Sequence, residues 1–253
     1  MKKLMMCIFL AAVFTFSHAH VFAETIMVCG NAEKPPKQWE DEAGQYKGIW
    51  IDIIKAIDRE MPDIDFQISL LPWKRAYKGG VEGKNAMMGM FYNEERSGIF
   101  DFSDPVLAEK VVIAVKKGKE FKFDSMEDLK DKKIGIYAGT SYGSEWQNAV
   151  DRGIFTVDED FSNPQRLKKI LADVIDGGIF NPGTAAVKML CDNAPDMSPE
   201  DFTVLEHPVL AENSYFAIAK KLNRKDLIEK FNAALRKIKE SGEYQQIIDK
   251  YGK

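Results

Sequence analysis

Histidine and cysteine are scarce in this chain of 253 residues, which contains three of each. Cys7, His18 and His20 lie within the first 23 residues, which we interpret below as a leader peptide. The one imidazole left, His207, is too little for a histidine-rich metal site or a nucleophile–histidine pair. The sequence therefore predicts no metal, no cofactor and no catalytic residues.

The other two cysteines, Cys29 and Cys191, leave a disulfide open. An exported protein meets an oxidising compartment, in which thiols pair. Each of the two lies within or beside an apolar run, however, where single buried thiols are common. Sequence alone does not place them close together, so both states are open at this point.

Long apolar runs are missing except at the amino terminus. There, two lysines precede an apolar run at 4–16, and Val-Phe-Ala at 21–23 offers the small residues that a signal peptidase reads. This pattern is typical of a secretory signal peptide and is too short to span a bilayer. We expect residues 1–23 to be removed, so that a periplasmic protein starts at Glu24.

A basic surface is also missing. Without Lys2 and Lys3, 33 basic residues face 39 acidic ones, a net charge of −6. The content of 45% hydrophobic and 29% charged residues is that of an ordinary globular protein. We expect no nucleic acid among its partners.

The most informative stretch lies at 72–105. It predicts a helix at 73–81, a glycine-bearing turn, a strand at 86–91, and a helix that Asn93 caps and that carries Arg96. Arg96 thus follows the carboxyl end of a strand, the edge at which α/β sheets bind ligands. A guanidinium and helix-start N–H groups converge there on an anion. The alternative is an exposed arginine that pairs with a nearby glutamate.

The rest of the chain alternates strands and helices. A strand at 25–29, a helix after Gly48 and a strand at 64–71 form a parallel βαβ unit. Further strands are predicted at 110–117, 132–138, 202–205 and 214–220, and helices at 164–175, 228–238 and 244–251. The helix at 164–175 would place Val174 and Ile175 on its apolar face. At 230 mature residues, two α/β lobes of about 100 residues each are expected.

A second glycine turn follows the strand at 132–138. Its residues are Gly139, Thr140, Ser141, Tyr142 and Gly143, and a helix begins there. The free N–H groups at such a helix start can hold an anion. A plain strand-to-helix turn explains the same pattern.

Several short motifs occur in a specific order. They are Pro35-Pro36, Gly48 with Asp52, Gly83-Lys84, Glu95-Arg96, Phe102-Ser103-Asp104-Pro105, Asp128-Leu129 with Gly139-Thr140-Ser141, Phe231 to Leu235, and Asp249-Lys250-Tyr251-Gly252. With the signal peptide, this order resembles the family-3 extracellular solute-binding proteins of bacterial ABC importers, of the polar amino acid-binding type. The resemblance covers almost the whole mature chain.

The resemblance implies an α/β, two-lobed, periplasmic-binding-protein type II fold. Each lobe would be a mostly parallel sheet flanked by helices, and two crossing strands near 110–117 and 214–220 would join them around a hinge. The signal peptide at 1–23 would precede lobe 1 at 24–112, lobe 2 at 113–214, and the carboxyl-terminal part of lobe 1 at 215–253.

The resemblance also assigns roles in the cleft. Arg96 and the backbone and hydroxyl of Ser141 match the groups that hold a ligand carboxylate. The aspartate that holds an amino group in such proteins is replaced by Asn181, and the usual threonine by Asn93. Because an amide does not neutralise an ammonium ion, the ligand either lacks an α-amino group or finds its counter-charge elsewhere, for instance at Glu33.

Aromatic side chains are candidates for the walls of the cleft, since ligand pockets are mostly apolar with a few polar groups. The candidates are Trp39, Trp73, Phe91 and Tyr142, beside Thr140 in the second turn. Trp73 fits the core equally well. Trp50 and Trp146 are expected outside the pocket, in the core or on the surface.

The resemblance implies a periplasmic binding protein that captures a small polar or anionic, amino acid-like solute and hands it to the membrane permease of an ABC importer. We expect a monomer that performs no covalent chemistry. Two alternatives share the fold: an enzyme like cyclohexadienyl dehydratase, in which Glu33 would be the acid, and a ligand-sensing module for a receptor. The sequence holds no His-Glu-x-x-His or P-loop motif to favour the enzyme.

Overall fold

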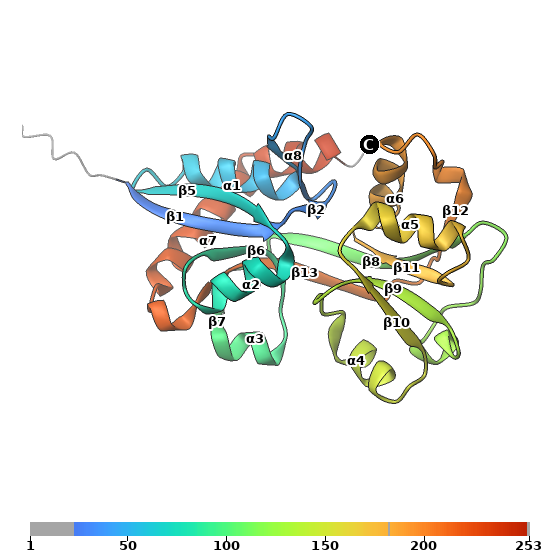
Figure 1. Ribbon diagram of the computed structural model, residues 1–253. Coiled ribbons are helices and arrows are strands. Elements are labelled where there is room, and N and C mark those ends of the chain that lie inside the picture. Colours follow the sequence, from blue (N-terminus) through green and yellow to red (C-terminus); the bar gives the residue numbers. More distant parts are fainter. Residues whose placement is uncertain (1–22, 182, 252–253) are drawn as a thin grey trace, which may run out of the picture.

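A computed structural model describes residues 23–181 and 183–251 and shows two lobes side by side (Figure 1). The predicted leader peptide lies outside the described residues, apart from Ala23. Among the described residues, the longest helices are too short or too polar to cross a membrane. Each lobe is a sheet flanked by helices, which confirms the predicted fold class.

The sheet of lobe 1 is built on β1 (Glu24–Asn31), which pairs in parallel with β5 (Ile64–Leu71) and β6 (Ala86–Phe91). β7 (Phe100–Phe102) lies farther along, beside β13 (Leu210–Ala219). The helices of this lobe are α1 (Ile49–Arg59), α2 (Trp73–Val81), α3 (Glu94–Ile99), α7 (Lys225–Glu240) and α8 (Glu243–Tyr251).

The sheet of lobe 2 is built on β9 (Lys133–Tyr137), which pairs in parallel with β10 (Thr156–Asp160) and β11 (Gly177–Phe180). β12 (Phe202–Val204) pairs with β8 (Leu107–Lys116) in an antiparallel register. Its helices are α4 (Gly143–Asp151), α5 (Asn163–Leu171) and α6 (Gly183–Asp192), with short 3-10 turns at Met126–Leu129 and Pro199–Asp201.

Two long strands join the lobes. β8 and β13 pair with each other in an antiparallel register from Leu107↔Ser214 to Val111↔Leu210. Beyond this register, β13 pairs with β6 of lobe 1 and β8 pairs with β11 of lobe 2. The crossing strands are therefore confirmed, while the division of the chain at 112/113 and 214/215 stays a prediction.

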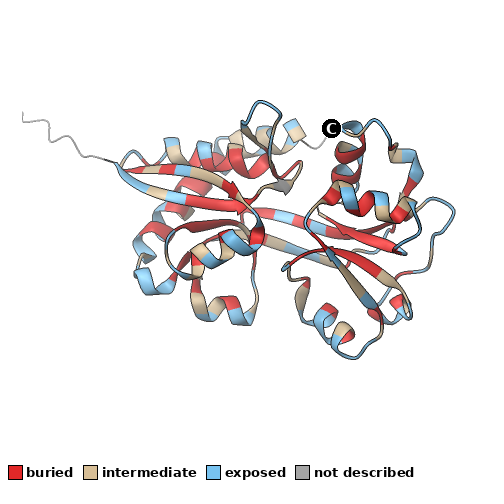
Figure 2. Ribbon diagram, viewed as in Figure 1, coloured by how far each residue is buried: buried red, intermediate tan, exposed pale blue. Residues whose placement is uncertain are grey.

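Each lobe has its own apolar core, as the buried centres of both sheets show in Figure 2. α1 turns Trp50, Ile53, Ile54 and Ile57 inward, all with no exposed surface. Trp146, 3% exposed, belongs to the core of lobe 2. Both tryptophans are thus core residues, as one of the two predicted alternatives had it. Apolar side chains at helical spacing explain this, because their burial supplies most of the stability of a short helix.

Side chains cap two helix starts, of which the one at Asn93 was predicted. The Asn93 side chain accepts a hydrogen bond of 2.8 Å from the Arg96 N–H, and so fixes the first turn of α3. Ser125 and Asp128 form a capping box at the 3-10 turn, where the Asp128 carboxylate accepts the Ser125 N–H at 3.0 Å.

The prediction of a helix at 164–175 is wrong at its end. α5 stops at Leu171, and Asp173 follows in a left-handed conformation with φ of 56°. Its carboxylate binds Lys116 at 2.9 Å and Lys119 at 2.7 Å. The turn leaves Val174 50% exposed, although Ile175 is buried. An aspartate tolerates this conformation, and its two lysine partners hold it there.

The segment between the first strand and α1 forms a small sheet. It comprises β2 (Glu33–Lys34), β3 (Gln38–Glu40) and β4 (Tyr46–Lys47). The two described cysteines, Cys29 and Cys191, are both buried and free, which decides the question that the sequence left open.

Candidate ligand-binding cleft

The two lobes meet at the carboxyl ends of their parallel strands. In lobe 1, β1 and β5 point toward lobe 2 (Figure 1). In lobe 2, Tyr137 at the end of β9 packs into an apolar cluster of lobe 1 that includes Trp73. On the outside, Lys74 Nζ lies 3.8 Å from Glu159. The lobes are thus in contact, and the ligand-binding edges of both sheets face each other.

Arg96 lies at this edge, at the start of α3, and is 6% exposed. Its Nη1 donates to the carbonyl of Phe91 at 2.9 Å, and its guanidinium lies over the rings of Trp73 and Tyr77 at 5.7 and 5.5 Å. It forms no ion pair with a described carboxylate. Burial lowers the pKa of its guanidinium, because an enclosed cation without an anion is destabilised.

A second buried arginine, Arg166 of α5, lies across the cleft and was missed by the sequence analysis. It is 1% exposed, and its Nε, at 3.1 Å, and its Nη2 both donate to the Asp160 carboxylate. Its Nη1 donates to Asn163 at 2.9 Å and to the carbonyl of Ile179 at 2.8 Å. The sequence analysis predicted no strand at 156–160, so the position of Asp160 at the end of a strand is seen only in the structure.

A narrow cavity opens between these walls. Its described lining combines the predicted Thr140, Tyr142 and Asn181 with two cations that the sequence analysis did not select, Lys34 and Arg166. Tyr137, Asn163 and Ile179 complete this lining. No carboxylate of the described residues lines it. Burial also raises the pKa of Tyr142, so that the phenol stays neutral at physiological pH.

Lys34 reaches the cavity from β2 of lobe 1. Burial, together with the charges of Lys37, Arg166 and Arg96 and against the pull of Glu109, lowers its pKa to about 7. It forms no ion pair with a carboxylate of the described residues. The surroundings of this ammonium are therefore short of negative charge.

A buried triad links the lobes to the hinge. Lys37 Nζ of lobe 1 and Asn181 Nδ2 of lobe 2 both bind Glu109 Oε2 of β8, each at 2.5 Å. The side chains of Lys37 and Glu109 are 1% and 0% exposed. Glu109 Oε1 and Asn181 Oδ1 have no hydrogen-bond partner among the described residues. The neutral amide at 181 is thus held by a carboxylate that the sequence analysis did not single out.

The other predicted site residues are spread around this cavity. Phe91 is buried at the lobe boundary, with Lys37 Nζ 5.6 Å from its ring centre. Trp73 is both core and cleft, since it is 6% exposed and lies beneath Arg96. Ser141 precedes α4 and is partly exposed. As ligand contacts, these residues stay predictions.

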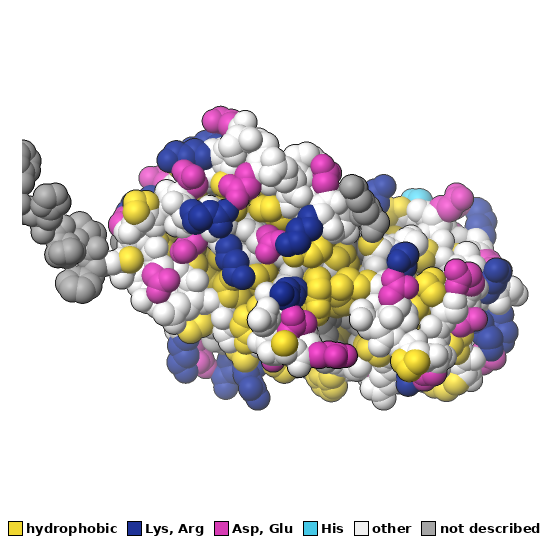
Figure 3. Space-filling model, turned by 90° about the horizontal axis from the view of Figure 1, so that it is seen from above, with side chains coloured by type: hydrophobic (Ala, Val, Ile, Leu, Met, Phe, Trp, Pro, Cys, Tyr) yellow, Lys and Arg dark blue, Asp and Glu magenta, His cyan; other side chains and the backbone are white. Residues whose placement is uncertain are grey.

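Trp39 borders a different hollow. It is partly buried and meets the ring of Tyr251 edge-to-face at 6.1 Å. It lines a groove with Pro35 of lobe 1, Leu190 of lobe 2 and the acidic residues Glu40, Asp41 and Glu42. Figure 3 shows hydrophobic side chains at the surface where the lobes meet. The side chain of Glu33 lies outside the described part of the chain, and its backbone pairs with Trp39.

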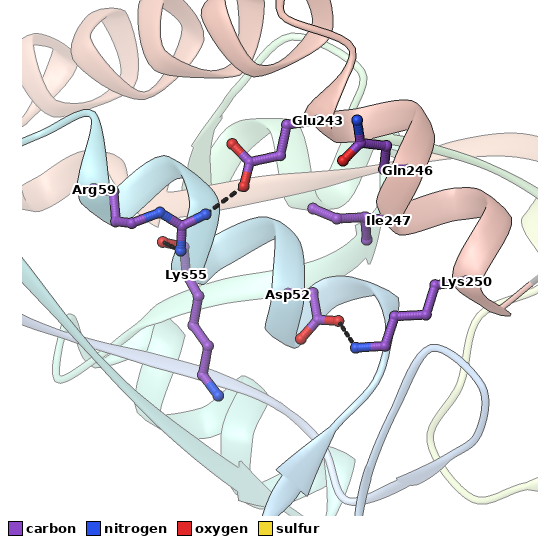
Figure 4. Close-up of a pocket in the computed structure, with 7 residues that line it drawn as sticks. All are labelled: Asp52, Lys55, Arg59, Glu243, Gln246, Ile247 and Lys250. Carbon is purple, nitrogen blue, oxygen red and sulfur yellow. Dashed lines mark hydrogen bonds and ion pairs between the residues drawn. The ribbon is translucent and has the colours of Figure 1, made fainter.

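A further hollow, drawn in Figure 4, lies between α1 and α8 and takes no part in the cleft. Its charges are internally matched: Lys250 binds Asp52 at 2.7 Å, and Arg59 binds Glu243. Such pairs fasten α8 onto lobe 1. They leave no excess charge for an ionic ligand, apart from Lys55 at the rim.

The chain is similar to several bacterial binding proteins. It is 28% identical to the ABC transporter arginine-binding protein 1 of Escherichia coli (strain K12), over 99% of each chain. It is 28% identical to the arginine-binding periplasmic protein of Mannheimia haemolytica, over 86% of each. It is 24% identical to the L-cystine-binding protein TcyJ of Escherichia coli (strain K12), over 90% of this chain and 82% of the relative.

Solved structures show the same architecture. An ancestral arginine-binding protein bound to arginine matches with a TM-score of 0.77 and 25% identity, over 91% of this chain and 99% of that one. An ancestral amino acid-binding protein described as a precursor of cyclohexadienyl dehydratase matches with a TM-score of 0.73 and 25% identity, over 90% and 96%. The model of the bacterial extracellular solute-binding proteins, family 3, matches residues 26–253, and the chain belongs to this family.

Proposed function

We propose that this protein binds a small solute bearing a carboxylate between its lobes, and delivers it to the membrane permease of an ABC importer without covalent chemistry. The observation that carries the proposal is Arg96, a buried arginine at the lobe-facing edge of the sheet with no described carboxylate partner. The arginine-, histidine- and cystine-binding relatives support a solute of amino acid-like size.

In this proposal, the Arg96 fork takes the ligand carboxylate in a bidentate pair, because a guanidinium and a carboxylate match in geometry. The N–H groups around Thr140 and Ser141, before α4, approach the same anion from lobe 2. Since the two contacts come from different lobes, the ligand has its highest affinity for the closed arrangement and shifts the hinge equilibrium toward it.

Calorimetry on the exported chain, residues 24–253, tests the binding step. A thermal-shift screen of amino acids and small carboxylates selects ligands, since any ligand of the native state raises the melting temperature. We expect at least one carboxylate to bind and to reduce the radius of gyration in solution scattering. If carboxylate-bearing solutes neither raise the melting temperature nor change the scattering profile, the proposal fails.

Export, partner and oligomeric state are tested separately. Intact mass of the secreted protein should correspond to a chain that begins at Glu24, and light scattering should give the mass of a monomer. Uptake of the identified solute should depend on both the binding protein and its permease. Uptake that is unchanged when the binding protein is deleted would contradict the transport role.

An enzymatic function is the second candidate, because a precursor of cyclohexadienyl dehydratase is among the similar structures. Such an enzyme needs a carboxylic acid in the cleft to promote elimination, the role that the sequence analysis considered for Glu33. A prephenate turnover assay decides between the two. We expect no turnover above the uncatalysed rate, and turnover that Glu33→Gln abolishes would establish the enzyme instead.

A further inference from the structure

The cationic side chains that converge on the cleft outnumber its carboxylates. The charges of Lys37, Arg96 and Arg166 all lower the pKa of Lys34, and the carboxylate of Glu109 raises it. Two of the four are matched one to one, since Lys37 pairs with Glu109 and Arg166 with Asp160. Lys34 and Arg96 are left without a partner among the described carboxylates.

This excess is local. The face of the molecule seen in Figure 3 interleaves basic and acidic side chains, and the whole sequence carries more acidic than basic residues. A general basic surface therefore does not explain the buried Arg96 and the partly buried Lys34. Keeping them without an anion is costly, so an anionic ligand gains from neutralising them.

The two unmatched cations reach the cleft from different segments of lobe 1. Arg96 starts α3 after β6, whereas Lys34 reaches, from β2, a cavity that is otherwise lined by residues 137–181 of lobe 2. A single carboxylate neutralises one of them. A ligand with two anionic ends neutralises both.

The remaining lining of the cavity gives a cationic group little support. Thr140, Tyr142, Asn163 and Asn181 are neutral, and the nearest carboxylate, Glu109, already binds Lys37 and Asn181 through one oxygen. An ammonium placed in this cavity would meet Lys34 and Arg166. Glu109 Oε1 is the one buried carboxylate oxygen without a described partner that could accept it.

Resting on the proposed function, we infer that the solute is a small dicarboxylate of net charge −2, with one carboxylate on Arg96 and the other on Lys34. Lys34 is then the residue that selects two anionic ends over one. An acidic amino acid such as glutamate has the same two ends but adds an ammonium, and binds more weakly for that reason.

Pairs of ligands that differ in one group test the inference. Calorimetry at pH 6.5 compares succinate and glutarate with aspartate, glutamate, butyrate and arginine, on the wild type, Lys34→Gln and Lys74→Gln. Lys74, an exposed lysine of the same lobe, is the matched control. We expect dicarboxylates to bind at least about tenfold more tightly than the other ligands. Lys34→Gln should weaken them at least about tenfold, and Lys74→Gln less than about fivefold.

Each other outcome overturns the inference in a distinguishable way. Tighter binding of aspartate or glutamate shows that Glu109 or the side chain of Glu33 supplies a counter-charge. Tighter binding of arginine or of a monocarboxylate is consistent with the proposed function but contradicts the inference that the ligand carries a second carboxylate. Dicarboxylate binding that Lys34→Gln does not change removes Lys34 from the site. Binding of none of these ligands, with no carboxylate found in the wider screen, contradicts the proposed function as well.

Discussion

The cleft has one buried arginine on each wall, and the two differ in a single respect. Arg96 and Arg166 are 6% and 1% exposed, and each guanidinium lies over two aromatic rings within 6.0 Å. Arg166 donates to the Asp160 carboxylate through both Nε and Nη2. Arg96 donates to the carbonyl of Phe91 and pairs with no carboxylate of the described residues. The charge of Arg166 is therefore neutralised within lobe 2, whereas no carboxylate of the described residues neutralises Arg96, as the proposed binding of an anion requires.

This comparison separates burial from function. Both arginines would be selected by a search for buried charge, but the matched one has its charge and most of its donors satisfied within lobe 2. A buried pair holds a structure when both partners are present, and it is strongly destabilising when one is removed. A buried arginine without an anion contributes no such stability. Stability and binding should therefore respond oppositely at the two positions.

The largest effect is expected for Arg166→Ala. The substitution leaves the Asp160 carboxylate buried without its cation, and should lower the free energy of unfolding by about 3–5 kcal/mol. Urea denaturation measures this. Arg166→Met combined with Asp160→Asn should recover part of the loss, because no charge then stays unmatched. A stability close to that of the wild type in Arg166→Ala would remove the distinction between the two walls.

Arg96→Ala should show the reverse pattern. The ligand carboxylate loses its bidentate partner in an enclosed site, so affinity should fall by about 2–5 kcal/mol, while the melting temperature of the ligand-free protein stays the same or rises. Arg96→Lys should also lose affinity, because a point charge does not replace the fork. Calorimetry beside a melting curve measures both. Affinity lost together with a collapsed melting temperature would assign Arg96 to the structure.

The sequence predicted the wall of lobe 1 better than that of lobe 2, for a physical reason. Asn93 and Arg96 lie three residues apart, so the cap and the arginine that it positions appear as one local pattern. Arg166 looked like the polar face of an amphipathic helix. Its partner Asp160 is close in sequence, but only the packing of β10 against α5 shows that both are buried.

No local sequence pattern predicts the interlobe triad of Lys37, Glu109 and Asn181. Lys37 and Glu109 are 72 residues apart, as are Glu109 and Asn181, and the three meet only when both lobes fold around the hinge. The neutral amide at 181 is evident from the sequence, whereas the carboxylate that binds it, Glu109, is not. Periodicity and turn residues, by contrast, predict most strands and helices. The prediction fails where a tertiary contact ends a helix, as that of Asp173 does.

A smaller effect concerns pH. Burial and the charges of Lys37, Arg166 and Arg96, against the pull of Glu109, lower the pKa of Lys34 in the folded protein from its ordinary value of 10.5 to about 7. An anionic ligand needs its charged form, so binding takes up a proton as pH rises above 7. Affinity for a dicarboxylate should then fall by up to about tenfold per pH unit. Calorimetry in buffers of different ionisation enthalpy measures the proton uptake.

The same group affects stability with a defined sign. Between about pH 7 and 10.5 the unfolded chain binds more protons at Lys34 than the folded one, so the contribution of Lys34 to stability becomes more favourable with rising pH. Lys34→Gln should therefore stabilise the ligand-free protein more at pH 6.5 than at pH 9.5, and should abolish the pH dependence of affinity. An identical pH profile of affinity in the variant would place the titration elsewhere.

The smallest effect on ligand affinity is expected at an exposed ion pair between the two lobes. Lys74 Nζ lies 3.8 Å from Glu159 across the lobe boundary, but the two side chains are 61% and 50% exposed. Water already solvates both charges, and exposed pairs of this kind contribute little. Lys74→Met should weaken ligand binding by less than about fivefold, and the difference should vanish in 1 M salt, where the screening length falls to about 3 Å. Calorimetry at low and high salt measures it, with Arg96→Ala as the comparison whose loss should persist under the same salt. A loss at Lys74 as large and as salt-resistant as that at Arg96 would mean that lobe closure is held at the exposed rim of the cleft, and that burial does not rank the contacts of its two walls.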